Sequence, residues 1–280
     1  MRSGHALPGG VGSETCLEFE FRSGRVGTFM AGRRDLKVAV QVMGGFGVRR
    51  GLRRLQLRPS TRRLIALLAV EGAIARDDAA VRLYEDQRLD RAYANLRTIM
   101  WRLRVDANGL VIEEADGLRI DADIVDFQEA VRWSSAMLQR EAPPTAPPPF
   151  IGRRLLPGWS EPWLVAPREH LHLLQLHALD AAAERLLMAG RFGEAAASAL
   201  LAVTMDPLRE SSNRLLVEVL IREGNVADGL RSYEAYRRLL AEEVNAEPGP
   251  AIQSLISPLL AAGYVTPRAI ANRSRLNRSL

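Results

Sequence analysis

Apolar side chains recur at helical spacing over much of the chain, and the most regular amphipathic stretch covers residues 89–104. Ala92 and Ile99 widen its apolar face, whose main positions follow one another at intervals of four, three, four and three: Leu89, Tyr93, Leu96, Met100 and Leu103. The opposite face holds side chains that hydrogen-bond base edges or phosphates, with no carboxylate among them: Arg91, Asn95, Thr98 and Arg102. The pattern predicts a helix with one face in a core and the other open to a groove. The alternative is an ordinary amphipathic helix with a solvated basic face.

The elements around this helix form a recognisable order. Strand-like alternation begins at residue 38 with VAVQV and continues with FGV and with LQL at 55–57. Pro59 and Ser60 start a helix that ends near Gly72, and a second short helix runs from 77–78 to 84. After the helix at 89, VIEEADGLRI predicts two strands joined by a tight Asp-Gly turn. A sheet, three helices and a hairpin are the elements of a winged helix-turn-helix domain, with the third helix as reader and the hairpin as wing.

The second half of the chain has a different pattern. A helix is expected at 126–140, and APPTAPPPF then places five prolines in nine residues, which is typical of a semi-rigid spacer. Beyond it, Gly and Pro punctuate five predicted helices, at 168–188, 192–204, 208–223, 226–244 and 250–262. The segments that begin at Gly190 and Gly224 are similar and lie 34 residues apart, the period of tetratricopeptide repeats. The sequence predicts a short helical solenoid, and a helical bundle that merely dimerises is the alternative.

The expected fold class is therefore mainly α: a winged helix-turn-helix domain with a small sheet and a wing hairpin, followed by an all-α, tetratricopeptide-like repeat domain. The predicted boundaries are a disordered leader at 1–36, the DNA-binding domain at 37–124, a connecting helix and Pro-rich linker at 125–150, the repeat domain at 151–265 and a basic tail at 266–280.

Charge is concentrated around the predicted reader helix. The whole chain carries a net charge of +5, but residues 41–105 alone hold 14 basic and 6 acidic side chains. Such a local excess is the footprint of a phosphate-binding surface. No apolar run is long enough to cross a bilayer, and Cys16 is the only cysteine, so an internal disulfide is excluded. We expect a cytoplasmic protein that does not bind membranes.

The sequence offers few candidate residues for catalysis, nucleotide binding or metal binding. The only lysine, Lys37, follows GRRDL rather than a Gly-rich phosphate loop. His170, His172 and His177 cluster near one helix start, but no carboxylate or cysteine set completes a metal site. No serine has the context of a nucleophile. The sequence therefore predicts a protein that is not an enzyme and that has no cofactor and no metal.

The residues from LLPGWSEPW to GRFGEA and from DPLRESS to AEPGP are similar to the bacterial transcriptional activation domain, and residues 37–125 resemble the winged helix of response regulators. Together the two halves resemble the Streptomyces antibiotic regulatory protein family in its small form. The resemblance implies a transcriptional activator of an antibiotic biosynthesis cluster that binds direct repeats near the promoter −35 region. Its implied partners are double-stranded DNA, RNA polymerase holoenzyme through a sigma factor, and a second copy of the chain.

The resemblance also implies roles for single residues. Base reading falls to Asn95, Thr98 and Arg102 of the third helix. For phosphate binding the resemblance indicates Arg91, Arg97 and Arg104. We also expect phosphate contacts from Arg62 and Arg63 of the first helix and from Arg119 of the wing. The wing departs from the family in being acidic, with Glu113, Glu114 and Asp116 near its tip, which predicts repulsion from DNA or contact with a protein. The alternative function is a helical-repeat interaction or signalling module that binds nucleic acid only non-specifically.

Overall fold

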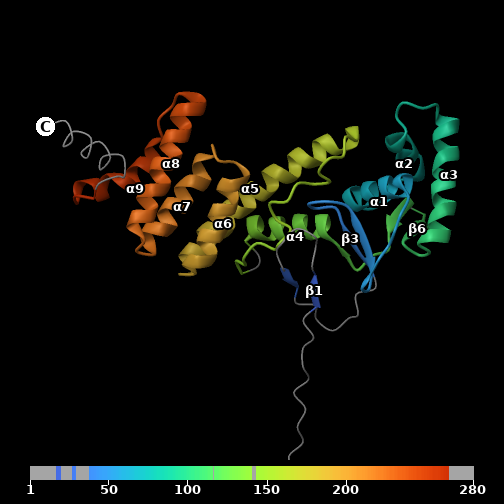
Figure 1. The fold of residues 1–280 in the computed structure, drawn as a ribbon, viewed down its shortest axis with the longest axis horizontal. Helices are drawn as coiled ribbons and strands as arrows, with labels where there is room; N and C mark the ends of the chain where they lie inside the picture. Colours follow the sequence, from blue (N-terminus) through green and yellow to red (C-terminus); the bar gives the residue numbers. More distant parts are fainter. Residues whose placement is uncertain (1–16, 20–26, 30–37, 116, 141–142, 265–280) are drawn as a thin grey trace, which may run out of the picture. The chain divides into compact units, whose positions relative to one another are not determined.

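A computed structural model describes residues 17–19, 27–29, 38–115, 117–140 and 143–264 of the chain (Figure 1). Contacts divide the chain into two units, residues 1–36 and residues 37–280. In the first unit, β1 (Leu17–Phe19) and β2 (Gly27–Phe29) pair antiparallel, with Leu17 opposite Phe29. The rest of the predicted disordered leader and the whole of the predicted basic tail lie outside the described residues.

The second unit begins with the sheet of the winged helix, whose strand order is β5-β4-β3-β8. Strands β3 (Val38–Gln41), β4 (Gly47–Arg50) and β5 (Arg53–Arg54) are antiparallel neighbours, and β8 (Ile124–Val125) joins β3 in parallel. The prediction of a strand at 55–57 was wrong by about two residues. Only Leu55 still bonds to β4, through its N–H to the Val48 carbonyl at 2.9 Å, and Leu57 instead turns into the core just before Pro59.

Three helices follow the sheet as predicted: α1 (Pro59–Glu71), α2 (Arg76–Leu83) and α3 (Leu89–Asp106). The core-facing residues of α3 are Ala92, Leu96, Ile99, Met100 and Leu103, all buried. Leu89 does not belong to this buried stripe, because it is the first residue of the helix and is 57% exposed. The apolar periodicity of the sequence therefore places α3 against α1 and α2, and it leaves the other face of the helix outside the core.

The wing consists of β6 (Val111–Glu114) and β7 (Gly117–Ile120), paired antiparallel. Ile74, in the loop between α1 and α2, exchanges two backbone hydrogen bonds with Leu118 at 3.0 and 2.8 Å. Gly117 has φ +129°, and a Cβ at this position would lie 2.1 Å from the Ile74 carbonyl oxygen. Only glycine permits this close approach, so the turn end of the wing hairpin is tied directly to the loop between α1 and α2.

The rest of the chain is helical: α4 (Asp126–Gln139), a short 3₁₀ turn η1 (Pro162–Leu164), α5 (Val165–Met188), α6 (Phe192–Met205), α7 (Glu210–Arg222), α8 (Val226–Val244) and α9 (Pro250–Ala261). The predicted repeat is present, because α6 and α8 begin 34 residues apart, each after a glycine of positive φ. Consecutive helices pack on one another from α4 to α8, and α9 packs on α7 (Figure 1).

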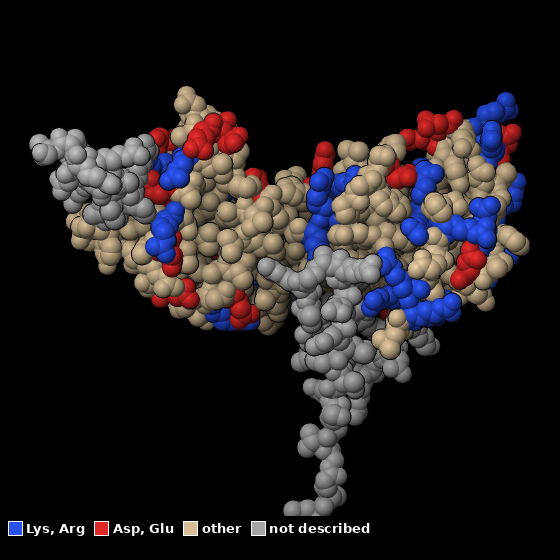
Figure 2. All heavy atoms as spheres, in the orientation of Figure 1, with Lys and Arg blue, Asp and Glu red and all other residues tan. Residues whose placement is uncertain are grey.

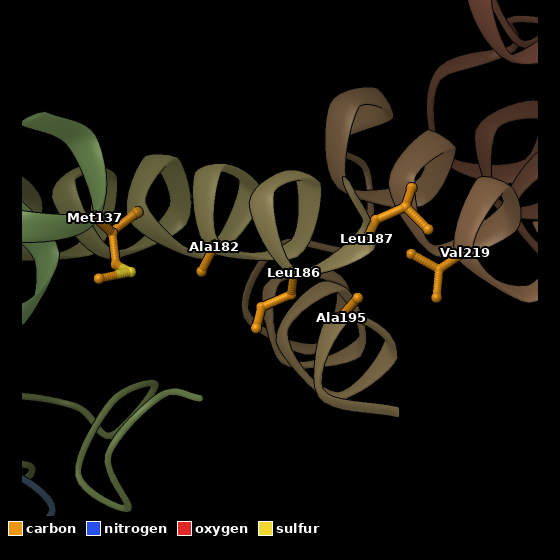
Figure 3. Packing of buried hydrophobic residues seen from close by; sticks show 7 residues of the cluster. Met137, Ala182, Leu186, Leu187, Ala195 and Val219 are labelled. Carbon is orange, nitrogen blue, oxygen red and sulfur yellow. The ribbon is translucent and has the colours of Figure 1, made fainter. Parts of the chain in front are cut away.

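One core of this half joins α4 to the repeat. Met137 of α4 belongs to the same buried cluster as Ala182 and Leu186 of α5, Ala195 of α6 and Val219 of α7. Figure 3 shows Leu187 and Val219 turned toward each other between α5 and α7, with Met137 beside α5. Among the described helices, none combines the length and the apolar character that a membrane crossing requires.

Candidate nucleic-acid interface

The three residues predicted to read bases all lie on the outer face of α3. Asn95 is half-buried, and its side-chain N–H donates to Oε1 of Gln87 at 2.8 Å. This contact fixes the amide while leaving a second N–H and the carbonyl oxygen available. Thr98 is exposed, with its hydroxyl donating to the Ala94 carbonyl at 2.9 Å. Arg102 is half-buried, and its positive charge acts on Tyr84. The structure therefore brings the three together on one surface.

Three of the predicted phosphate contacts flank these residues on the same helix. Arg91, Arg97 and Arg104 are exposed, and their guanidinium groups make no hydrogen bond or ion pair with any described residue. Each is a charged group held on a rigid helix with its donors directed to solvent. An arrangement of this kind suits phosphate oxygens, which arginine binds through two parallel N–H groups.

The other three predicted phosphate contacts are engaged within the chain to different degrees. Arg62 donates through Nε to the Leu57 carbonyl at 2.8 Å and stays exposed. Arg119 forms an ion pair with Glu114 at 2.6 Å. The Arg63 guanidinium is engaged inside the chain, because it donates to both carboxylate oxygens of Glu161 at 2.7 Å and to the Leu83 carbonyl at 2.8 Å. The same group also lies over the Tyr84 ring, 5.6 Å from the centroid.

The acidic wing is partly neutralised by its neighbours. Glu113 forms an ion pair with Arg76 of α2, and Glu114 pairs with Arg119 on the facing strand. The hydrogen bond from Arg119 lowers the pKa of the Glu114 carboxyl below its ordinary value. Asp116 lies outside the described residues. The acids of the wing therefore neutralise two arginines, Arg76 of α2 and Arg119 of the wing itself.

Two features of this surface escaped the sequence reasoning. Trp101 of α3 is 64% exposed on the same outer face, although its helical spacing from Thr98 was visible in the sequence. Four arginines also meet on the β4–β5 hairpin, where Arg49 faces Arg54 and Arg50 faces Arg53. Arg50 donates to the Asn108 carbonyl just beyond α3 at 2.7 Å, so this hairpin adjoins the end of the helix. In the view of Figure 2, Lys and Arg gather over the winged helix, whereas acids are more frequent over the repeats.

The winged helix is joined to the segment that follows the prolines by direct backbone contacts. The Leu156 N–H donates to the Val42 carbonyl, and the Gly44 N–H donates to the Arg154 carbonyl, both at 2.8 Å. Leu155 and Leu156 are 2% and 0% exposed. We refer to these contacts, together with those of Asp126 and Glu161, as the junction. The chain that was predicted to be a linker thus leads into a segment that packs on the winged helix.

A buried carboxylate anchors the same junction. Asp126 begins α4, is 8% exposed, and accepts hydrogen bonds from the Val42 and Met43 N–H groups at 2.8 and 2.9 Å. Burial raises the pKa of Asp126 to about 7, although the backbone hydrogen bonds act in the opposite direction. Across the junction, Arg168 donates to the carbonyls of Leu155, Leu156 and Trp159. Polar groups at the junction are therefore satisfied inside the chain.

Comparison with known proteins agrees with this architecture. The family model described as "Bacterial transcriptional activator domain" matches residues 122–260, which include α4. The regulatory protein AfsR of Streptomyces coelicolor is 29% identical over 215 residues, and AfsR of Streptomyces griseus is 27% identical over 212 residues. Each match covers 71% of this chain and 22% of the relative, so the chain spans about a fifth of the length of these proteins.

A solved structure shares the fold. EmbR of Mycobacterium tuberculosis, determined in complex with a low-affinity phosphopeptide, superposes with a TM-score of 0.53 over 86% of this chain and 71% of that one, at 16% identity. This likeness extends across both halves, the winged helix and the helical repeats. The activator-domain match and the two AfsR relatives make the chain similar to the Streptomyces antibiotic regulatory protein family, and they support a role in transcription regulation. In this chain the matched activator domain follows a winged helix.

Proposed function

We propose that this chain is a sequence-specific DNA-binding activator of a secondary-metabolite (antibiotic) biosynthesis cluster. It binds direct repeats near the promoter −35 region and recruits RNA polymerase holoenzyme through the sigma factor. The observation that carries the proposal is the outer face of α3, where Arg91, Arg97 and Arg104 have no intramolecular anion while the core-facing side is fully packed. A helix of this kind enters the major groove in winged helix-turn-helix proteins.

The proposal assigns base reading to Asn95, Thr98 and Arg102. Asparagine pairs with adenine and arginine with guanine through two hydrogen bonds each, and a threonine methyl group contacts thymine. Arg62, Arg91, Arg97 and Arg104 bind phosphates, with Arg119 in a minor role because it shares its charge with Glu114. Arg63 leaves the phosphate set, since Glu161 already satisfies its guanidinium. In this assignment residues 37–124 bind DNA, while residues 151–265 contact polymerase and a second copy on the tandem site.

The test is selection of duplexes from a randomised library by the full-length chain, followed by competition against random duplex. A specific activator prefers its selected site by ~10³-fold or more at physiological salt. Asn95→Ala and Arg102→Ala should each cost about 1–3 kcal/mol of specific binding. Arg238→Ala is the matched control, because Arg238 is an exposed arginine of α8 in the repeat half.

Failure of the selection has a clear meaning. If no sequence is enriched and every duplex binds alike, the chain is a helical-repeat interaction module with non-specific affinity only. If a site is enriched but neither α3 variant weakens it, another surface reads the DNA. Transcription from the selected site with purified holoenzyme then tests the activator role, which requires more transcript in the presence of the chain than in its absence.

A further inference from the structure

A second apolar stripe runs along the outside of α3. Its members follow one another at intervals of four, three and four residues, and all four are exposed: Ala94, Thr98, Trp101 and Val105. Trp101 is 64% exposed and Val105 is 66% exposed. The core of the domain is already filled by the opposite stripe, so these side chains contribute nothing to holding α3 in place. A large aromatic ring at the centre of an exposed stripe is unusual enough to require a partner.

Arginines border this stripe on both sides. With 3.6 residues per turn, Arg91 and Arg102 lie along one edge of the stripe, and Arg97 and Arg104 lie along the other. None of the four guanidinium groups has a hydrogen bond or ion pair to a described residue. The outer face of α3 is thus an apolar line between two rows of unpaired cations. This symmetry distinguishes it from an ordinary amphipathic helix, in which the charges lie in one sector.

The occupant of such a face must be polyanionic at its edges and apolar at its centre. The major groove of DNA has this layout, because an α-helix fills its width and phosphates line both walls. On the groove floor the one apolar group is the C5 methyl of thymine. A second copy of the chain fits poorly, since a symmetric contact through this face would bring the two sets of arginines together.

We propose that Trp101 is a specificity-determining residue that selects thymine by packing its indole ring against the C5 methyl group in the major groove. The inference rests on the proposed DNA-binding function and deepens it, because it names the base and the group that one side chain reads. Thr98, one turn away on the same stripe, adds its methyl group to the contact, and the bordering arginines set the depth of the helix in the groove.

The first arm of the test needs no protein variant. In the selected duplex, each thymine is replaced in turn by deoxyuridine, which removes only the C5 methyl group and keeps the base pair. One or two positions should lose affinity for the full-length chain by about fourfold, the factor expected for one buried methyl-sized group. An unchanged affinity at every thymine overturns the proposal.

The second arm assigns the effect to the residue. Trp101→Ala should bind the thymine duplex roughly tenfold more weakly or worse, as truncation of a buried interfacial Trp does. Trp101→Ala should also lose no further affinity when deoxyuridine replaces thymine at the sensitive position. Trp101→Phe should keep part of the sensitivity to the methyl group. Leu173→Ala, an exposed leucine of α5 that is 53% exposed, is the control for apolar surface lost elsewhere.

The outcomes separate the two proposals. If the library yields no preferred sequence, the DNA-reading function itself fails. If a preferred sequence is found but Trp101→Ala keeps both the affinity and the full methyl sensitivity, only the role of Trp101 fails. If Trp101→Ala changes the sedimentation of the chain without DNA instead of the affinity for the duplex, the stripe is a contact between copies, and the thymine assignment is wrong.

Discussion

Arginine is used in opposite ways in the two halves of the second unit. In the helical repeats several arginines meet a carboxylate about one turn away, as in the pairs Arg191–Glu194, Arg214–Glu218, Arg231–Asp228 and Arg237–Glu234. On α3, Arg91, Arg97 and Arg104 have no acid at that spacing and no ion-pair partner among the described residues. The same side chain is neutralised inside the chain in one half and left for an external anion in the other.

The contrast indicates what each half recognises. Self-neutralised charges keep a surface soluble without attracting a polyanion, because their fields cancel at a distance comparable to the screening length. Unpaired arginines on a rigid helix retain a long-range attraction for phosphate and release counterions when they bind it. The chain's overall net charge conceals this difference, since residues 151–265 hold 14 acidic and 11 basic side chains and so offset part of the positive charge of the winged helix. Position and pairing, rather than the number of arginines, distinguish the winged-helix half, which we propose binds DNA.

The largest effect should come from removing the unpaired set. The triple variant Arg91→Ala, Arg97→Ala and Arg104→Ala should reduce the slope of log affinity against log salt by about three and weaken DNA binding on the order of 100-fold at physiological salt. Both quantities are read from duplex titrations across a salt series.

The matched control removes the same charge from the repeats through Arg222→Ala, Arg231→Ala and Arg238→Ala, all exposed residues. Its salt slope should equal that of the unchanged chain. An equal loss in the two triple variants would mean that binding depends on net charge alone, and the contrast between the halves would then have no functional meaning.

The next largest effect is a pH dependence of the free energy of unfolding, which comes from the buried Asp126 at the junction. Because the folded-state pKa of Asp126 is raised to about 7 from an ordinary 3.8, the folded chain holds a proton that the unfolded chain releases between these values. Stability from this group is complete below about pH 4 and is lost as the pH rises through 7, by at most about 1.4 kcal/mol per pH unit. Urea unfolding between pH 4.5 and 7.5, roughly the window that these pKa values define, measures the slope.

Asp126→Asn should flatten this slope, whatever it does to absolute stability, since the amide cannot titrate. Asp121→Asn serves as the comparison, because Asp121 is exposed in the same segment. A slope that persists unchanged in Asp126→Asn would place the titrating group elsewhere. The result sharpens the contrast by showing an acid whose burial inside the chain affects folding.

Much of the fold follows from local sequence. Pro59 starts α1, Gly190 and Gly224 mark the repeat turns, and apolar spacing alone identifies the core face of α3. Partners distant in sequence do not follow from such patterns. Arg62 and Arg63 look alike in the sequence, yet only Arg63 points at a carboxylate 98 positions away, and β8 joins the sheet from beyond the wing. Trp101 lay within the helix predicted to read DNA, but its place in a second stripe becomes apparent only once the first stripe is known to fill the core.

Arg62 and Arg63, neighbours at the start of α1, allow a direct comparison between an arginine available to phosphate and one paired inside the chain. Arg63→Ala and Glu161→Ala, combined in a double-mutant cycle, should show a coupling of about 1 kcal/mol in unfolding, because the pair is bidentate but partly open to solvent. The salt slope of DNA binding should not change in Arg63→Ala. Arg62→Ala should do the reverse, with little effect on stability and a slope lower by about one counterion. A slope change in Arg63→Ala as large as that in Arg62→Ala would show that Arg63 also reaches phosphate.

The smallest effect concerns the wing, where two arginines of the winged-helix half form ion pairs with acids, as several arginines of the repeats do. Glu113 and Glu114 occupy Arg76 and Arg119, and near a polyanion they also repel it. Replacing both with Gln removes two negative charges and releases two cations, so duplex affinity should rise by roughly three- to tenfold at low salt, with a steeper salt slope. Glu242→Gln with Glu243→Gln, exposed acids of α8, makes the same charge change far along the chain and should have little effect on duplex affinity.

If the wing variant binds DNA more weakly, the two acids act by positioning Arg76 and Arg119 for phosphate, and the repulsion is not what limits affinity. If affinity rises but transcription by holoenzyme falls, the acids serve a protein contact, and the wing then belongs functionally with the repeats rather than with α3.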